Sequence, residues 1–205
     1  MRSVRLGWFG LILNYGYRIA IRKGAWWEAL IQEAAPHPGE RILEVSAEGF
    51  SAYAMLARDY PTVHFTALQP VKPTKIAGNL PSNLELLHGD QCGIDCRAAS
   101  VDKIICSLAL HPLPQNGKLT FLKEMRRVLR QGGTLYLADF DQPLQPRENH
   151  VLRATGYLFG PETTTSHYDG TWLNLFKQAG FVSVRRVSSF SEIVGRVTIV
   201  RARRG

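Results

Sequence analysis

Cysteines, acidic residues and long apolar runs are all scarce in this chain of 205 residues. Three cysteines are too few for a disulfide scaffold, and their odd number favours a reducing compartment. They are Cys92, Cys96 and Cys106. The spacing of the first two, Cys-x3-Cys, has no second pair, so we interpret them as loop cysteines and predict no metal site. Without disulfides or a metal, a chain of this length must fold around one apolar core, which its 45% hydrophobic content can supply.

No apolar run in the chain is long enough to cross a bilayer, which takes about 20 mostly apolar residues. The longest uncharged stretch near the front is Leu6–Tyr17. Arg18, Arg22 and Lys23 follow it without a small-residue cleavage site, so it does not resemble a secretory signal. We therefore expect a cytoplasmic location, with peripheral attachment to a membrane as the alternative.

The net charge of +8 is confined to the two ends of the chain. Residues 1–24 hold five basic residues and no acid, and residues 177–205 hold seven basic residues and one acid, so the residues between carry a net negative charge. Aromatic side chains such as Trp8 and Phe9 accompany the basic N-terminal residues, a combination that suits an anionic membrane surface. A solvated charged face is an equally good interpretation. No zinc-finger, RNP or helix-turn-helix pattern appears, so no specific nucleic-acid partner is predicted.

Strand and helix patterns alternate along the chain, without internal repeats. Strands are predicted at Arg41–Val45, Val63–Leu68, Leu84–Leu87, Val101–Leu108, Thr134–Ala138, Phe181–Val187 and Ile193–Arg201. Helices are predicted at Trp26–Ala35, Ser51–Arg58, Val71–Leu80, Asn116–Arg130 and Thr171–Ala179. In the second helix Ala52, Met55 and Leu56 should share one face, and Gly132–Gly133 should end the fourth.

This order predicts a single α/β, Rossmann-like domain with a mostly parallel seven-stranded sheet and helices on both faces. The last two strands have no helix between them and should form an antiparallel hairpin, at the edge or in the centre of the sheet. We expect this domain to span residues 25–205, with residues 140–170 as an insertion on the substrate side. Residues 1–24 would form a separate aromatic and basic segment that acts as a lid, a membrane contact or an oligomer contact.

In an open α/β sheet, ligands bind outside the carboxyl ends of the strands. Here that rule selects the loop Glu44–Phe50 after the first strand. Four further patterns follow in order: Gln69 stands 25 residues after Glu44, and then come His88-Gly89-Asp90, Ser100–Cys106 and Leu129–Leu135. In this order the chain resembles the class I S-adenosylmethionine-dependent methyltransferases, in particular the quinone-biosynthesis and other small-molecule branches, over roughly residues 40–202.

The resemblance implies S-adenosylmethionine as cofactor and S-adenosylhomocysteine as product. The residues it implies for cofactor binding lie on the loops after the first four strands. They are Glu44, Ser46, Ala47, Gly49, Gln69, Pro70, Asp90, Gln91 and Ser107. Asp90 corresponds to the family's acid near the adenine amino group. The expected activity is methyl transfer to a small apolar or aromatic acceptor.

Two features depart from the family pattern. Ser46, Glu48 and Phe50 occupy the three glycine positions of the first loop, where side chains take up space that the backbone needs to approach a ligand. Gln69 replaces the acid that accepts hydrogen bonds from the ribose hydroxyls, at a cost of about 1–2 kcal/mol. The alternative function is therefore a non-catalytic, methyltransferase-like protein that binds a partner, a membrane or another ligand.

Methyl transfer from a sulfonium depends mainly on alignment, and a base is needed only if the acceptor must lose a proton. His111, after the fourth strand, and Asp139, at the end of the fifth, are the catalytic candidates. His150, Tyr157, His167 and Tyr168 are candidates for contacting the acceptor. His150 and Tyr157 would share a helix face if residues 148–158 are helical. The partners we expect are a small-molecule acceptor and, as options left open, an anionic membrane surface and a second copy of the chain.

Overall fold

The computed structural model describes residues 24–46, 50–69, 79–88, 93–192 and 195–205. Within these ranges the side chains of residues 50–53, 69 and 88 are not described. The predicted N-terminal segment and the predicted helix at Val71–Leu80 therefore lie wholly or almost wholly outside the described residues.

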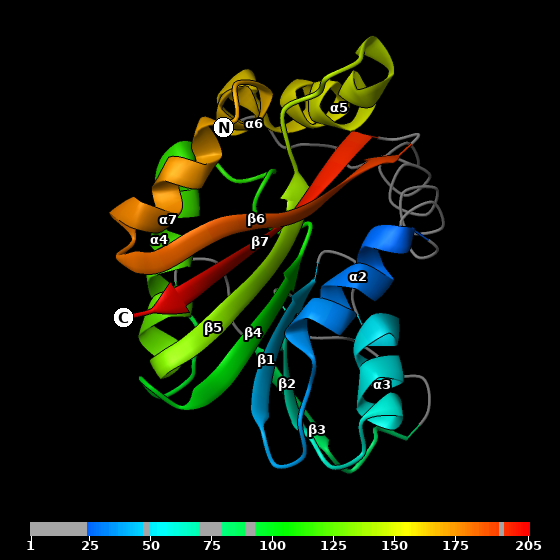
Figure 1. Cartoon of the computed structure of the whole chain (residues 1–205), viewed down its shortest axis with the longest axis vertical. Helices are drawn as coiled ribbons and strands as arrows, with labels where there is room; N and C mark the ends of the chain where they lie inside the picture. Colours follow the sequence, from blue (N-terminus) through cyan, green and yellow to red (C-terminus); the bar gives the residue numbers. More distant parts are fainter. Residues whose placement is uncertain (1–23, 47–49, 70–78, 89–92, 193–194) are drawn as a thin grey trace, which may run out of the picture.

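A seven-stranded sheet runs through the molecule in the order β3-β2-β1-β4-β5-β7-β6 (Figure 1). The strands are β1 (Arg41–Ser46), β2 (His64–Gln69), β3 (Leu84–His88), β4 (Val101–Ser107), β5 (Leu129–Phe140), β6 (Phe181–Glu192) and β7 (Gly195–Arg204). The first five pair in parallel, and β7 pairs antiparallel with both β5 and β6. The predicted architecture is confirmed, and the hairpin lies at the edge of the sheet.

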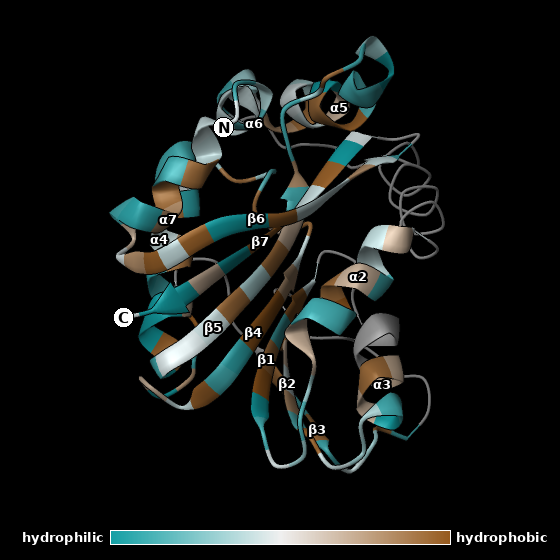
Figure 2. Ribbon diagram, viewed as in Figure 1, coloured by the Kyte–Doolittle hydropathy of each residue, from teal (hydrophilic) through white to brown (hydrophobic). Residues whose placement is uncertain are grey.

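Helices cover both faces of this sheet, and each covers its own part of the core. Strand residues alternate between the two faces, so Leu43 packs with the cluster under α4 (Gln115–Val128) and α7 (Asn174–Gln178). Ile42 packs with the cluster under α2 (Ala25–Ala34) and α3 (Phe50–Asp59). In Figure 2 the hydrophobic residues gather along the central strands, as a sheet buried on both faces requires.

Most of the segment between β5 and β6 lies over the carboxyl ends of the parallel strands, at the top of Figure 1, whereas its last helix, α7, lies beside α4. It consists of η1 (Pro146–Asn149), α5 (His150–Phe159), η2 (Pro161–Thr163), α6 (Thr165–Tyr168), η3 (Thr171–Leu173) and α7. We call residues 146–168 the insertion. It covers the edge of the sheet where strand-end side chains meet.

Two details of the sequence prediction are wrong. The helix predicted to run to Arg130 ends at Val128, because Leu129 is already paired with Val101 in the sheet. The two glycines therefore lie inside β5, at the irregularity that separates this pair from the pairing of Lys103 with Thr134. Met55 is 49% exposed and does not share the buried face of Leu56.

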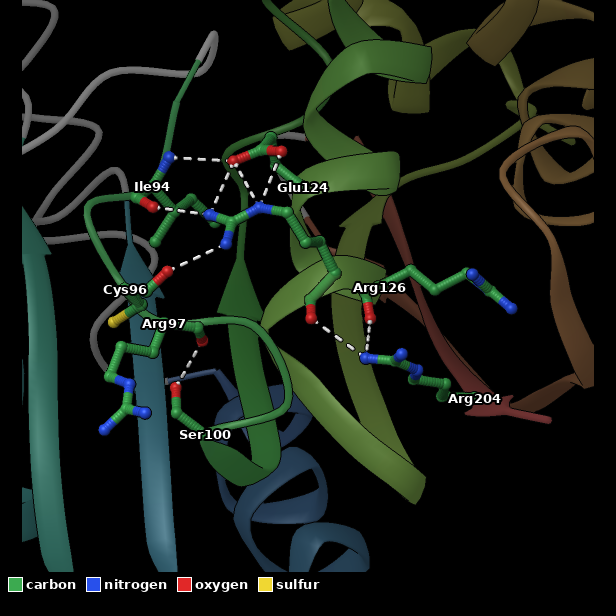
Figure 3. A network of polar contacts seen from close by, with 8 residues as sticks. Ile94, Cys96, Arg97, Ser100, Glu124, Arg126 and Arg204 are labelled. Carbon is green, nitrogen blue, oxygen red and sulfur yellow. Dashed lines mark hydrogen bonds and ion pairs between the residues drawn. The ribbon is translucent and has the colours of Figure 1, made fainter.

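Helix α4 fastens the connection between β3 and β4 through a pair of charged residues (Figure 3). Arg127 donates to both carboxylate oxygens of Glu124 and to the carbonyl oxygens of Ile94 (2.7 Å) and Cys96 (2.8 Å). Glu124 in turn accepts the Ile94 amide. At the other end of the same figure, Arg204 donates to the carbonyls of Arg126 and Arg127 and so caps the helix C-terminus.

Within the described ranges, no helix is both long and apolar enough to span a membrane.

Gly133 offers a test of the tight turn within β5. A Cβ there would lie 2.9 Å from the carbonyl oxygens of both Arg130 and Asp102. Because these are backbone atoms, they can move away only if the strands themselves shift. We expect Gly133→Ala to lower the free energy of unfolding by about 1–3 kcal/mol in urea titrations. At Gly93 a Cβ meets no atom of the described residues within 4 Å, so Gly93→Ala is the matched control and should change stability by less than about 0.5 kcal/mol. Equal effects would contradict the steric argument.

Candidate active site

The carboxyl ends of β1 and β4 bring three of the predicted cofactor residues together. Ser46 and Ser107 are register partners, and Glu44 lies between Ala67 of β2 and Ile105 of β4. All three side chains are buried, with exposed fractions of 8%, 0% and 1% for Ser46, Ser107 and Glu44. Within the described part of the chain, Ser107 Oγ is among the few buried side-chain nitrogen and oxygen atoms without a hydrogen-bond partner.

The other cofactor predictions fall at the limits of the description. Ala47, Gly49, Pro70, Asp90 and Gln91 lie outside the described residues, as does Glu48 of the altered loop. Gln69 is placed only by its backbone, which pairs with His88 at the end of β2. The backbone of Phe50 begins α3.

His111 and Asp139 form a buried dyad beside this edge. His111 Nδ1 lies 2.8 Å from Asp139 Oδ1, and the exposed fractions of the two residues are 5% and 0%. The carboxylate also accepts the amides of Leu110 (2.7 Å), His111 (3.1 Å) and Phe140 (2.7 Å). Burial alone would raise the pKa of Asp139, but His111 and the backbone amides together hold it below its usual value.

These contacts give the two residues different roles. An ionised carboxylate can only accept, so the proton of a neutral His111 is on Nδ1 and the lone pair is on Nε2. Asp139 is saturated by four hydrogen bonds and is suited to orienting the imidazole rather than to taking a proton itself. Asp139 thus also binds the backbone amides of Leu110, His111 and Phe140.

His167 is buried behind the dyad, on the insertion. Its Nδ1 donates to the Phe140 carbonyl oxygen at 2.5 Å, and its ring stacks on Trp172 at a centroid distance of 5.0 Å. Its ring also meets that of His111 edge-on at 6.4 Å. Burial lowers the pKa of His167 to about 4, so the ring is neutral at pH 7. Its Nε2 is buried and, within the described residues, has no hydrogen-bond partner.

The remaining acceptor candidates are not brought together with the dyad. His150 and Tyr157 do share a face of α5, as the spacing predicts, but both are exposed, Tyr157 to 90%. Tyr168 is half-buried, and burial raises its pKa.

Sequence reasoning missed several buried charged residues, among them Lys118 and Asp141. Lys118 of α4 is fully buried and donates to backbone carbonyls of the loop after β4 and of the insertion. Asp141 accepts hydrogen bonds from Trp172 Nε1 and Thr198 Oγ1, both at 2.8 Å, and pairs with Arg186. The sequence gave only a weak indication that Lys118 is buried, namely its position in the predicted helix directly before the apolar Leu119.

A family model described as "Methyltransferase domain" matches residues 47–137. The demethylmenaquinone methyltransferase of Listeria monocytogenes serotype 4a (strain HCC23) is 27% identical over 175 residues, with 73% of each chain covered. That of Staphylococcus aureus (strain JH9) is 29% identical over 127 residues, covering 53% of this chain and 52% of the relative.

Solved structures share the fold. An S-adenosylmethionine-dependent methyltransferase from Mesorhizobium loti superposes with a TM-score of 0.66 at 18% identity, covering 89% of this chain and 99% of the other. A structure described as PigF with SAH gives a TM-score of 0.63 at 18% identity, covering 97% of this chain and 62% of the other.

The buried His167 predicts a pH dependence of stability. Its pKa is lower in the folded than in the unfolded chain, so its contribution is fully present above about pH 6.5 and is lost as the pH falls toward 4. We expect the free energy of unfolding to fall across this window, by at most about 1.4 kcal/mol per pH unit from this group. His167→Asn keeps a donor near Nδ1 but cannot titrate, so urea unfolding of this variant between pH 5 and 6.5 should show a shallower slope. An unchanged slope would mean that His167 is not the titrating group.

Proposed function

We propose, from the premise that this chain belongs to the class I S-adenosylmethionine-dependent methyltransferase family, that it is an enzyme that methylates a small aromatic acceptor. The observation that carries the proposal is the His111–Asp139 dyad. A buried, oriented imidazole lies at the strand edge where an α/β sheet binds its ligands.

The residues at the ends of β1 and β4 fit the cofactor. Ser107 presents a buried hydroxyl that no described residue bonds, and Ser46 beside it is small enough to leave room for a ligand. Glu44 supplies a buried carboxylate on the strand between β2 and β4. We propose that these three hold the cofactor. The loop residues proposed with them are Ala47, Gly49, Gln69, Pro70, Asp90 and Gln91.

When bound, S-adenosylmethionine supplies an electrophilic methyl group on a sulfonium. The chain's own contribution is to align the acceptor and exclude water, and His111 Nε2 would take the proton from an acceptor hydroxyl. Asp139 holds the imidazole in the required tautomer and stabilises the imidazolium that forms. His167 and Phe140 pack against the His111 ring and restrict its rotation.

For the acceptor we propose a hydroquinone or related phenol. The relatives named above are demethylmenaquinone methyltransferases, and the reduced form of a quinone is an aromatic diol. Removing a hydroxyl proton raises the electron density of the ring, and this is the step that a base such as His111 assists. Methylation at a ring carbon would replace its C–H bond by a C–methyl bond, so one proton would be released overall, and S-adenosylhomocysteine would be the second product. The insertion would form the acceptor-side wall.

The rival function is a non-catalytic protein of the same fold. It rests on Glu48 and Phe50 in the cofactor loop and on Gln69 in place of an acid. Neither the family match nor the named relatives favour it over an enzyme.

Calorimetric titration with S-adenosylhomocysteine separates the two functions. We expect micromolar binding, and tighter binding in the double variant Glu48→Gly with Gln69→Asp, since the loop gains space and the ribose hydroxyls gain a charged acceptor. No binding at millimolar concentration by a folded sample would overturn the proposal.

The base is tested by His111→Gln. With naphthohydroquinone as the probe acceptor, we expect kcat to fall by about 10²–10⁴-fold, because only the proton transfer is lost. The affinity for S-adenosylhomocysteine should stay within about twofold. His37→Gln, at an exposed histidine far along the chain from the dyad, is the control and should leave both quantities unchanged. A His111 variant with full kcat would remove this residue from the mechanism.

We also propose that residues 1–24 attach the chain to an anionic membrane surface, on the basis of their basic and aromatic composition. Deleting residues 1–22 should reduce co-sedimentation with anionic liposomes. Co-sedimentation that persists unchanged would argue against this segment as the anchor.

A further inference from the structure

Lys118 is a fully buried lysine whose ammonium joins two segments far apart in the sequence. It is the fourth residue of α4, and Nζ donates to the carbonyl oxygens of His111 (3.3 Å) and Leu113, in the loop that follows β4. Nζ also donates to the carbonyl oxygen of Thr163, in the insertion. The three N–H groups of the ammonium thus meet three carbonyls from two separate segments.

Such a group is costly to bury. Burial lowers the pKa of Lys118 to about 8, and the negative charge of Asp139 opposes that shift. A methionine or leucine would fill the same space without a desolvation penalty, and buried ionic groups are often replaceable by apolar ones without loss of stability. Stability alone therefore does not account for a lysine here, whereas its bonds to both segments supply a geometric role.

Of the two segments that Lys118 joins, one contains the candidate base and the other packs against its ring. On one side, Lys118 holds the backbone carbonyl of His111 itself. On the other, Thr163 precedes His167 by four residues, and the His167 ring packs edge-on against the His111 ring. The His167 Nδ1 bond to the Phe140 carbonyl gives the insertion a second attachment beside Asp139.

We propose that Lys118 is a positioning residue that couples the His111 loop to the insertion, so that the base and the acceptor-side wall keep one relative geometry. The proposed role in methylation rests on the proposed function, but the mechanical coupling does not. Lys118 contacts the backbone of His111 and acts through it.

A second cation on helix α4, Arg127, provides a control for Lys118. Arg127, nine residues further along the helix, donates to the carbonyls of Ile94 and Cys96 and so fastens a different loop. Both cations tie α4 to a neighbouring loop through backbone carbonyls. Only Lys118 reaches the insertion.

Hydrogen exchange measured by mass spectrometry on the full chain tests the coupling without any ligand. The relevant amides are hydrogen-bonded, including Leu110 and His111 to Asp139, Leu113 to Leu110, and Thr164 and His167 within the insertion. In Lys118→Met we expect exchange to rise at least about tenfold in peptides covering both 110–113 and 160–168. Lys118→Gln, which retains N–H donors, should restore part of the protection.

Arg127→Met should raise exchange in peptides covering 93–97 and leave the other two regions unchanged. If Lys118→Met leaves 160–168 unchanged, or raises exchange evenly across the chain, the coupling is refuted. If Lys118→Met does not fold, Lys118→Gln decides: a rise confined to the two regions supports the coupling, and an even rise or no change overturns it.

The catalytic consequence is measured separately. With naphthohydroquinone, Lys118→Met should lower kcat and raise the acceptor KM, while affinity for S-adenosylhomocysteine stays within about twofold. Altered exchange with unchanged kinetics would overturn the positioning role. If the unaltered protein shows no methyl transfer, the proposed function fails, and the exchange data still decide whether Lys118 joins the two segments.

Discussion

The buried carboxylate of Asp139 organises the part of the molecule where chemistry would occur. An unpaired charge at a fully buried position would cost several kcal/mol, so the surrounding chain must supply donors. It does so with the amides of Leu110, His111 and Phe140 and with the ring of His111. The loop after β4 therefore has little freedom, because two of its amides and one side chain bind the same group. The position and tautomer of His111 follow from that requirement.

A second layer of polar contacts surrounds this carboxylate. Lys118 binds the carbonyls of the same loop, and His167 binds the carbonyl of Phe140. Trp172 stacks on His167 and donates to Asp141, which also accepts from Thr198 of β7. The insertion is thus joined to the sheet edge by directional bonds as well as by apolar packing. Directional bonds fix one arrangement more narrowly than apolar contact does, which suits a site that depends on alignment.

The helix–sheet framework depends on more ordinary interactions. The predicted strands and their order along the chain were confirmed, because apolar runs of β-branched and aliphatic residues between turn residues identify a buried parallel sheet. The end of α4 was predicted wrongly because helical spacing continues through Leu129, whereas the pairing of Leu129 with Val101 places it in β5. Met55 fits the apolar face by spacing but is half-exposed. Local patterns cannot resolve such cases, since a neighbouring strand or helix decides them.

The sequence by itself determined the class of fold, the edge of the sheet where the candidate site is expected, and the candidacy of Glu44, Ser46, Ser107, His111 and Asp139. The fold class follows from periodicity, and His111 and Asp139 follow from the rule that ligands bind at strand ends. Glu44, Ser46 and Ser107 are what the resemblance to the methyltransferase family implies. Only the tertiary structure decided that His111 pairs with Asp139, that His167 is buried while Tyr157 is exposed, and that Lys118 lies inside the protein. Each of these depends on contacts between residues far apart in sequence, for example 28 positions for His111 with Asp139 and 45 for Lys118 with Thr163. The burial of Lys118 cannot be predicted from an apolar pattern, because its side chain is charged. Its partners are backbone carbonyls, which every sequence contains.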